Sequence, residues 1–385
     1  MSGGVDSSLA AALLKEDGHD VEGIFMRNWI NDSKSPGGCS SDKDWKDVQS
    51  VSKQLGIPIS RVDLSKDYWI KVFEPALKQF EVGNTPNPDI ACNREIKFGS
   101  LIDTIKERYL NSLKGDKKWW LATGHYARAV RAPNSMKTHL MRCVDQNKDQ
   151  TYFLSTVEQF ALQHCFFPLW PYTKTEVRKM AEERGLSVAK KEDSQGLCFV
   201  SPETKHFRDF LSSYLSPGPV KYVDEAGSTL ADDNRGFWSS TIGERSGVQL
   251  PQGNAQFQGK WYVAAKDVGQ GTIELVKGAN HPRLFKQGAV STDWIWANYP
   301  GSPDKLSVQL RHRQEPVPCI VHHYGAGNVG VFFQERQRSV TPGQHLAVYS
   351  GDICLGGGTI LESIEGLDEM GRMDWQTEGL NPLGL

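Results

Sequence analysis

A glycine-rich run at the start of the chain has the residue types that hold a phosphate group. Its glycines permit close approach of the backbone, and the apolar helical pattern that follows would point N–H groups and positive dipole charge at an anion. The spacing is neither that of a Walker A loop nor GxGxxG. The pattern alone leaves both a phosphate site and a simple capped helix open. The run consists of Ser2, Gly3, Gly4, Val5, Asp6, Ser7 and Ser8.

A second segment combines a thiol with a helix N-terminus. In NTPNPDIACNREIKFG (84–99), Asn87 is a good N-cap and Pro88 a good first helical residue. Cys92 then falls within about the first turn, where the helix dipole and nearby cationic side chains favour a thiolate. Asp89, at the same helix end, is placed for proton transfer or for binding a polar ligand group. The alternative is a buried thiol in an ordinary capped helix.

A third segment, KKEDSQGLCFV (190–200), places Cys198 after a basic loop, where a thiol is more reactive than inside a strand. The sequence permits the two thiols to meet in space but does not show it. No Cys/His spacing matches a structural zinc site, so we predict no metal site of that kind. We expect the remaining cysteines to fill cores; they are Cys39, Cys143, Cys165, Cys319 and Cys354.

The elements that must position these residues fall into three regions. Strand and helix patterns alternate up to about residue 200, which predicts an α/β fold with a parallel sheet covered by helices. The predicted helices are 7–17, 44–56 and 173–185, and the predicted strands are 21–26, 57–64 and 119–125. A Pro/Gly-rich stretch then opens a small domain, and short turn-punctuated strands from about residue 286 predict an all-β, barrel-like domain. The predicted divisions are 1–203, 204–284, 285–365 and a tail over 366–385.

Composition sets broad limits. The chain has 385 residues, with 44 basic and 46 acidic side chains, a formal net charge of −2 and 38% hydrophobic residues. Such a chain suits two or three globular domains, and it lacks the run of about 18 apolar residues that a membrane span needs. Its charge argues mildly against nucleic acid, although local patches decide phosphate affinity. Residues 1–20 carry four carboxylates against Lys15, the wrong balance for a transit peptide.

Ordered motifs along the chain resemble one protein family. SGGVDS resembles the PP-loop of the ATP pyrophosphatases, which cleave ATP between the α and β phosphates; this superfamily has many substrates. FMRNW, CSSDKDWKDVQ, GNTPNPDIACNREIKFG, ATGHYAR, KDQTYFL, DSQGLCFV and AVYSGDICLGGGTI then follow in order. Together they resemble the tRNA-specific 2-thiouridylases, and the DWKDVQ and NREIKFG forms resemble the mitochondrial branch. The resemblance covers nearly the whole chain.

In that family ATP adenylates O2 of the wobble uridine of certain tRNAs, and a persulfide sulfur attacks C2 and displaces AMP. The resemblance implies an ATP-dependent tRNA sulfurtransferase that requires Mg²⁺, acts on the anticodon region of tRNA and takes sulfur from a donor or relay protein. Cys198 matches the persulfide-bearing cysteine. Cys92 matches the cysteine that attacks the persulfide and leaves a disulfide, or frees hydrosulfide. A mitochondrial location is also implied.

The resemblance assigns further roles by position. Residues 2–8 match nucleotide-binding positions, as do Met26 and Gly124. The segment that meets the target base corresponds to Asn87, Pro88 and Asp89, with Asp89 as the candidate acid or base. Positions that match tRNA contacts are His125, Lys148, Asp149, Gln150, Arg311, His312 and Gln344. Read without the resemblance, Lys148 to Gln150 would be a solvated turn and Arg311 a charged face of an edge strand.

Two departures from the family pattern stand out. Glu244 occupies a position where the family usually has Gln, which puts an RNA contact there in doubt. Family members carry a short apolar strand before the PP-loop, and because Met1 stands inside that pattern we expect this chain to be a shortened form of a longer protein. Two other functions stay open: an ATP pyrophosphatase that amidates a small metabolite, and an inactive tRNA-binding protein.

Overall fold

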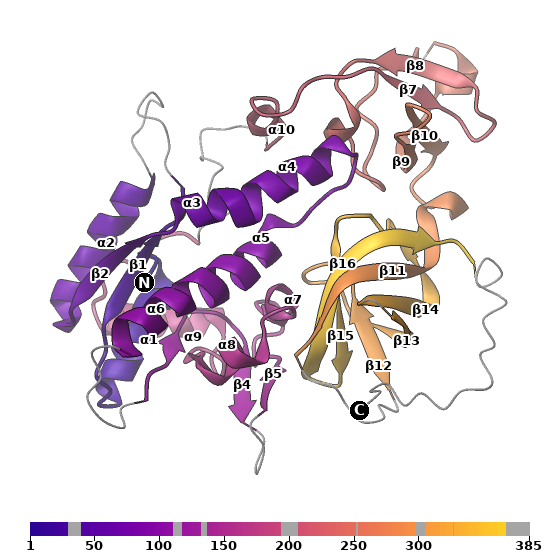
Figure 1. Ribbon diagram of the computed structural model, residues 1–385. Helices are drawn as coiled ribbons and strands as arrows, with labels where there is room; N and C mark the ends of the chain where they lie inside the picture. Colours follow the sequence, from indigo (N-terminus) through magenta and orange to yellow (C-terminus); the bar gives the residue numbers. More distant parts are fainter. Residues whose placement is uncertain are drawn as a thin grey trace.

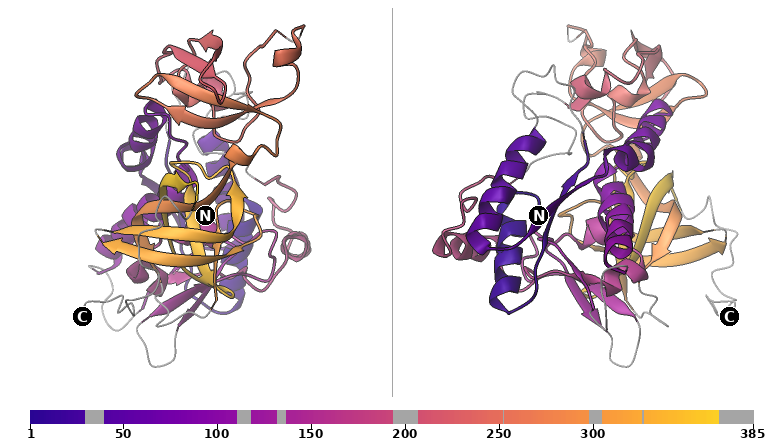
Figure 2. Two further views of the ribbon diagram at one scale, coloured as in Figure 1. Left: turned by 90° about the vertical axis from the view of Figure 1, so that its right-hand side faces the viewer. Right: turned by 60° about the vertical axis from the view of Figure 1, so that its left-hand side comes forward.

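A computed structural model describes residues 1–29, 40–110, 118–131, 137–193, 207–251, 253–297, 305–325 and 327–366. An N-terminal α/β domain occupies one side of the molecule, and a small central domain lies above a C-terminal β-barrel on the other (Figure 1). Two further views show the central domain and the barrel as separate bodies, each beside the N-terminal domain (Figure 2). The predicted three-part architecture is confirmed.

The N-terminal domain contains the predicted helices and parallel strands. β1 and β2 pair in parallel with Gly23 opposite Ile59, and β3 pairs in parallel with β6. Helix α9 begins with a capping box between Thr173 and Glu176, which satisfies two of the unpaired N–H groups at its start. The elements are α1 (Val5–Glu16), β1 (Gly23–Arg27), α2 (Ser40–Leu55), β2 (Ile59–Asp63), β3 (Leu121–Ala122), β6 (Cys165–Phe166) and α9 (Lys174–Glu183).

Two helical runs form an antiparallel pair at the centre of the domain (Figure 1). Each contains a π-helical stretch, a wider winding that is rare and is found most often at functional sites. The first run is α3 (Ser65–Tyr68), η1 (Trp69–Phe73) and α4 (Glu74–Glu81). The second run is α5 (Pro88–Ala91), η2 (Cys92–Ser100) and α6 (Leu101–Leu110). Cys92 is therefore the first residue of a π-helical segment, inside the helix that the sequence predicts as one element.

A hairpin of the N-terminal domain continues the sheet of the barrel. β4 (Arg128–Arg131) pairs with β5 (Thr138–Met141), and β5 pairs with β16, where Leu140 lies opposite Cys354. Short helices α7 (Thr151–Leu154) and α8 (Gln159–Gln163) follow in the chain. This shared sheet could not be predicted from the sequence, because the pairing of strands that are far apart in the chain leaves no local residue pattern.

The central domain is built on a four-stranded sheet in the order β8-β7-β10-β9. Its core contains Tyr222, Val263, Ile273 and Leu275, all nearly inaccessible to solvent. Its elements are α10 (Phe207–Leu211), β7 (Val220–Val223), β8 (Thr229–Asp233), η3 (Phe237–Ser239), η4 (Ala255–Phe257), β9 (Trp261–Asp267) and β10 (Thr272–Lys277).

The C-terminal domain is a closed barrel of six strands in the order β11-β14-β13-β12-β15-β16, with β16 pairing back to β11. Its interior is filled by apolar side chains such as Val308, Val331 and Leu346. The pairing of β16 with β11 requires glycine at Gly356, because a Cβ there would collide with the Ile295 carbonyl oxygen on β11. The elements are η5 (Pro282–Leu284), β11 (Phe285–Trp296), β12 (Leu306–Gln309), β13 (Val317–Gly325), β14 (Asn328–Arg338), β15 (His345–Ser350) and β16 (Ile353–Ile364).

Candidate functional site

The glycine-rich run forms a tight loop at the N-terminus of α1. Gly3 has φ +75°, and a Cβ there would lie 2.6 Å from the carbonyl oxygen of Asp44 on α2, so only glycine fits. The Ser7 hydroxyl oxygen accepts a hydrogen bond from the Ser2 backbone N–H at 3.0 Å. Gly4 is an extended N-cap without a side chain to cover the helix end. The first-turn N–H groups of α1 therefore face the loop, which is the arrangement that receives a phosphate.

The Asp6 carboxylate anchors a charged network beside this loop. It accepts hydrogen bonds from the Tyr126 hydroxyl at 3.0 Å and from the Lys174 ammonium at 2.7 and 2.8 Å. Lys174, whose side chain is only 12% exposed, also lies 2.8 Å from the carboxylate of Asp193. Burial and the neighbouring Asp6 charge raise the pKa of Tyr126, so the phenol keeps its proton and donates. Asp6 is thus held in place by two donors.

The ATGHY turn connects the loop with the helix that carries Cys92. A Cβ on Gly124 would lie 2.8 Å from both the Asp6 carbonyl carbon and the Ser7 nitrogen, so any side chain would push into the loop. The next residue, His125, packs its ring 5.6 Å from Phe98 on η2. Burial, with a smaller contribution from Lys97, holds the pKa of His125 well below its usual value, so the ring is neutral at physiological pH.

Asp89 and Cys92 lie on this same helical run, Asp89 in α5 and Cys92 at the start of η2. Asn87 caps the helix as predicted: its side-chain oxygen accepts a hydrogen bond from the Asp89 backbone N–H at 3.2 Å. Cys92 is buried, with 4% of its surface exposed. Burial raises the pKa of Asp89, and the Lys97 charge opposes that rise. Because Lys97 acts on both Asp89 and His125, these two groups share one electrostatic environment.

The loop before Asn87 is hydrogen-bonded to both the barrel and the central domain. The Thr85 N–H donates to the Pro342 carbonyl oxygen at 2.9 Å, and the Gln344 side chain donates to the Thr85 carbonyl oxygen at 2.7 Å. From the central domain, the Lys266 ammonium donates to the Gly83 carbonyl oxygen at 2.6 Å. The segment that is expected to meet the target base is therefore positioned by all three domains.

The turn over residues 148–150 is not the solvated turn that composition alone predicts. Asp149 is buried: its carboxylate accepts the Cys143 N–H at 3.0 Å and lies 3.5 Å from the Arg142 guanidinium. The Gln150 side chain accepts the Tyr126 N–H at 2.9 Å. Lys148 extends the charged network of the loop by pairing with Asp193 at 3.0 Å.

The barrel brings His312, another of the predicted RNA-contacting residues, to this turn. The His312 ring nitrogen lies 3.1 Å from the Asp149 carbonyl oxygen, and its ring centroid is 4.7 Å from that of Phe153. The neighbouring Arg311 donates to the backbone oxygens of Arg338 and Ser339 at 2.8 and 2.6 Å. His312 of the barrel thus contacts the 148–150 turn, although the two lie far apart in the sequence.

Comparison with known proteins identifies the family. A family model described as the tRNA methyl transferase HUP domain matches residues 1–202, its PRC-barrel domain matches 208–277, and an aminomethyltransferase beta-barrel domain matches 288–360. The mitochondrial tRNA-specific 2-thiouridylase 1 of Schizosaccharomyces pombe is 44% identical over 372 residues, covering 94% of this chain and 89% of that protein. The tRNA-specific 2-thiouridylase MnmA of Vibrio cholerae is 40% identical over 366 residues, covering 94% and 95%. The chain belongs to the tRNA-specific 2-thiouridylase family.

The remaining predicted residues lie outside the described part of the chain or in the protein core. Cys198 and Cys39 lie outside the described residues. Met26 lies on β1 opposite Val62 and packs against the domain core. The core-filling prediction is confirmed for Cys143, Cys165 and Cys354, which are buried, whereas Cys319 is half-buried and packs against the barrel core. The described part of the chain contains no cluster of three or more metal-binding side chains, and none of its helices is long and apolar enough to cross a membrane.

Sequence reasoning missed Lys174 and Asp193. A signal for Lys174 existed, because it is the first residue of α9, and a cation at a helix N-terminus opposes the helix dipole. Such a lysine needs an acidic partner, and here it has Asp6 and Asp193. Asp193 begins the DSQGLCFV motif, but its partners left no local signal, because three cations reach it from separate parts of the chain: Lys148, Lys174 and Arg178.

Proposed function

We propose that this chain is an ATP-dependent tRNA-uridine 2-sulfurtransferase. One observation supports it most: Gly124 seats against the PP-loop while His125 packs on the helix of Cys92, so the nucleotide loop and a cysteine helix share one site. The relatives named as tRNA-specific 2-thiouridylases support the same reaction. The relative named as mitochondrial supports a mitochondrial location, which fractionation of the source cells tests directly.

In the proposed reaction the uridine O2 attacks the α phosphate of ATP, and pyrophosphate leaves. The first-turn N–H groups of α1 bind the phosphates. Mg²⁺ would supply charge neutralisation of the phosphates. Asp6 belongs to the loop and offers a carboxylate, whose pairing with Lys174 must loosen before it could ligate that ion. Adenylation turns a poor leaving group into AMP, so C2 becomes open to a sulfur nucleophile.

Sulfur transfer then uses the two cysteines. The terminal sulfur of a Cys198 persulfide attacks C2, and AMP departs with O2. The Cys92 thiolate attacks the inner sulfur, which releases the nucleotide as 2-thiouridine and leaves a Cys92–Cys198 disulfide for reduction by a cellular dithiol. Asp89 is the proposed proton carrier at the base, and the raised pKa of its carboxyl group suits that role.

The test is reconstitution. The chain is incubated with ATP, Mg²⁺, a persulfide donor and unmodified tRNA, and nucleosides are analysed for 2-thiouridine. Cys92→Ser and Cys198→Ser should each abolish product, whereas Cys319→Ser, at a half-buried position that packs against the barrel core, should retain it. Thiolation that survives Cys198→Ser would exclude it as the persulfide carrier. ATP cleavage without any tRNA product would favour a different ATP pyrophosphatase, and tRNA binding without ATP cleavage would favour an inactive binder.

A further inference from the structure

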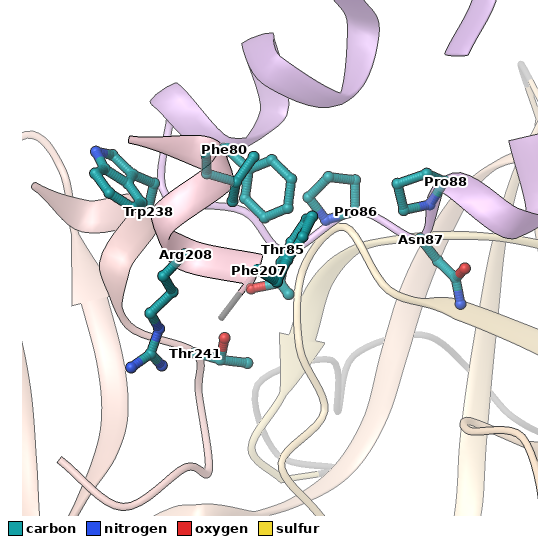
Figure 3. Close-up of a pocket in the computed structure, with 10 residues that line it drawn as sticks. Phe80, Thr85, Pro86, Asn87, Pro88, Phe207, Arg208, Trp238 and Thr241 are labelled. Atoms are coloured by element: carbon teal, nitrogen blue, oxygen red, sulfur yellow. The ribbon is translucent and has the colours of Figure 1, made fainter. Parts of the chain in front are cut away.

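A cavity of about 260 Å³ lies between the N-terminal and central domains, beside the segment expected to meet the target base. Its walls come from the end of α4, from residues 85–88, from α10 and from the turn at η3 (Figure 3). Asn87 and Pro88 line it, and Asp89 is the next residue along the chain. The cavity is therefore continuous with the proposed site for the target base.

The walls of the cavity are mainly aromatic. Phe80, Phe207 and Trp238 line it, and the rings of Phe80 and Phe207 lie 5.9 Å apart between centroids. The Trp238 indole N–H donates to the Ser216 carbonyl oxygen at 3.2 Å, so the ring is held in one orientation. Figure 3 shows Phe80, Pro86 and Trp238 along one side of the cavity. Flat apolar faces that are fixed in advance suit the face of a planar ring.

Among the described residues that line the cavity, the one cation, Arg208, is already neutralised. Arg208 pairs with the Glu244 carboxylate at 2.5 Å, and Glu244 also accepts the Thr241 N–H at 2.8 Å. A phosphate would have to compete with that carboxylate, whereas an uncharged ring would not. Glu244 is also the position at which this chain departs from the usual family glutamine, so the pair with Arg208 gives that departure a structural role.

The size of the cavity narrows the ligand further. Sites for drug-sized molecules occupy about 300–1,000 Å³, so this space is too small for ATP and suits one ring system. We propose that the cavity holds one nucleobase that flanks the target uridine, stacked on Trp238 and Phe207. The inference rests on the proposed function, because that function brings a splayed single strand to Asn87–Asp89. The binding energy would come from stacking of the base on the aromatic rings, an interaction that accepts any of the four bases.

The experiment compares anticodon stem-loop RNAs that are intact or carry one abasic nucleotide on the 5′ or the 3′ side of the uridine. Their affinity for wild type and for Trp238→Ala is measured by fluorescence anisotropy. Trp238→Ala should weaken binding of the intact RNA about 5- to 100-fold, and one of the abasic RNAs should bind wild type more weakly by a similar factor. With that abasic RNA the variant should cause little further loss, because the stacking partner is already absent.

Matched variants keep the result interpretable. Phe160→Ala removes a 45%-exposed aromatic ring on α8, away from the cavity, and should leave RNA binding unchanged. Trp238→Phe keeps a stacking face and should retain most of the affinity. Equal binding of all three RNAs to wild type, or losses that multiply in Trp238→Ala with both abasic RNAs, would overturn the proposal. If binding behaves as expected but no 2-thiouridine forms, the proposed function fails while the base site stands.

Discussion

The buried ion pair between Arg142 and Asp149 offers the sharpest test of the structure. The two groups lie 3.5 Å apart, and their side chains are only 9% and 4% exposed. Arg142 also donates to the Gln309 side chain at 3.1 Å and covers the Tyr349 ring at 4.0 Å. The pair therefore joins the N-terminal domain to the barrel at the point where β5 meets β16.

Asp149→Ala should destabilise the protein strongly. The change leaves the Arg142 guanidinium without its carboxylate and leaves the Cys143 N–H without an acceptor. Removing one partner of a buried pair costs about 3–5 kcal/mol, far more than the pair contributes over an apolar replacement. Replacing both partners, as Arg142→Met with Asp149→Leu, should therefore recover much of the loss.

Urea denaturation followed by tryptophan fluorescence measures this effect. The matched control is Glu74→Ala, which removes a helical pair with Lys78 in which both side chains are well exposed, and it should cost no more than about 0.5 kcal/mol. If Asp149→Ala unfolds within about 1 kcal/mol of wild type, or if the double replacement is no more stable than Asp149→Ala alone, the buried-pair reasoning is wrong.

Three further predictions concern the site. Gly124→Ala should lower ATP-dependent AMP formation at least about tenfold without a large fall in Tm, because its Cβ would displace the loop at Ser7; an unchanged rate would contradict the close contact. Lys97→Met should raise the pKa of Asp89 further, so any limb of the pH–rate profile that reports Asp89 should move to higher pH; a shift to lower pH would refute the assignment. Burial lowers the pKa of Lys266 to about 8, so between pH 8 and 10 the unfolded chain binds more protons than the folded chain. The free energy of unfolding of wild type, measured relative to Lys266→Met by denaturation, should therefore rise as the pH rises from 8 to 10.

Local features of the site can be predicted from the sequence almost completely. The PP-loop, the Asn87 cap and the helices over α1, α2 and α9 are recognisable because each depends on neighbouring residues: glycine φ angles, capping side chains and apolar spacing. The resemblance to one family rests on the same local motifs, in order along the chain. The π-helical winding that begins at Cys92 is different, since the apolar spacing of this segment predicts only a continuous helix.

The sequence by itself predicted which residues carry the chemistry, and it determined the helices and loops on which the described ones lie. Only the tertiary structure decided which of them meet. It paired Lys174 with Asp6 and Asp193, buried Asp149 on Arg142, joined His312 to the 148–150 turn and enclosed a cavity beside Asn87. These contacts join segments far apart in the chain, and their free energy depends on burial and charge that exist only once the three domains are packed together.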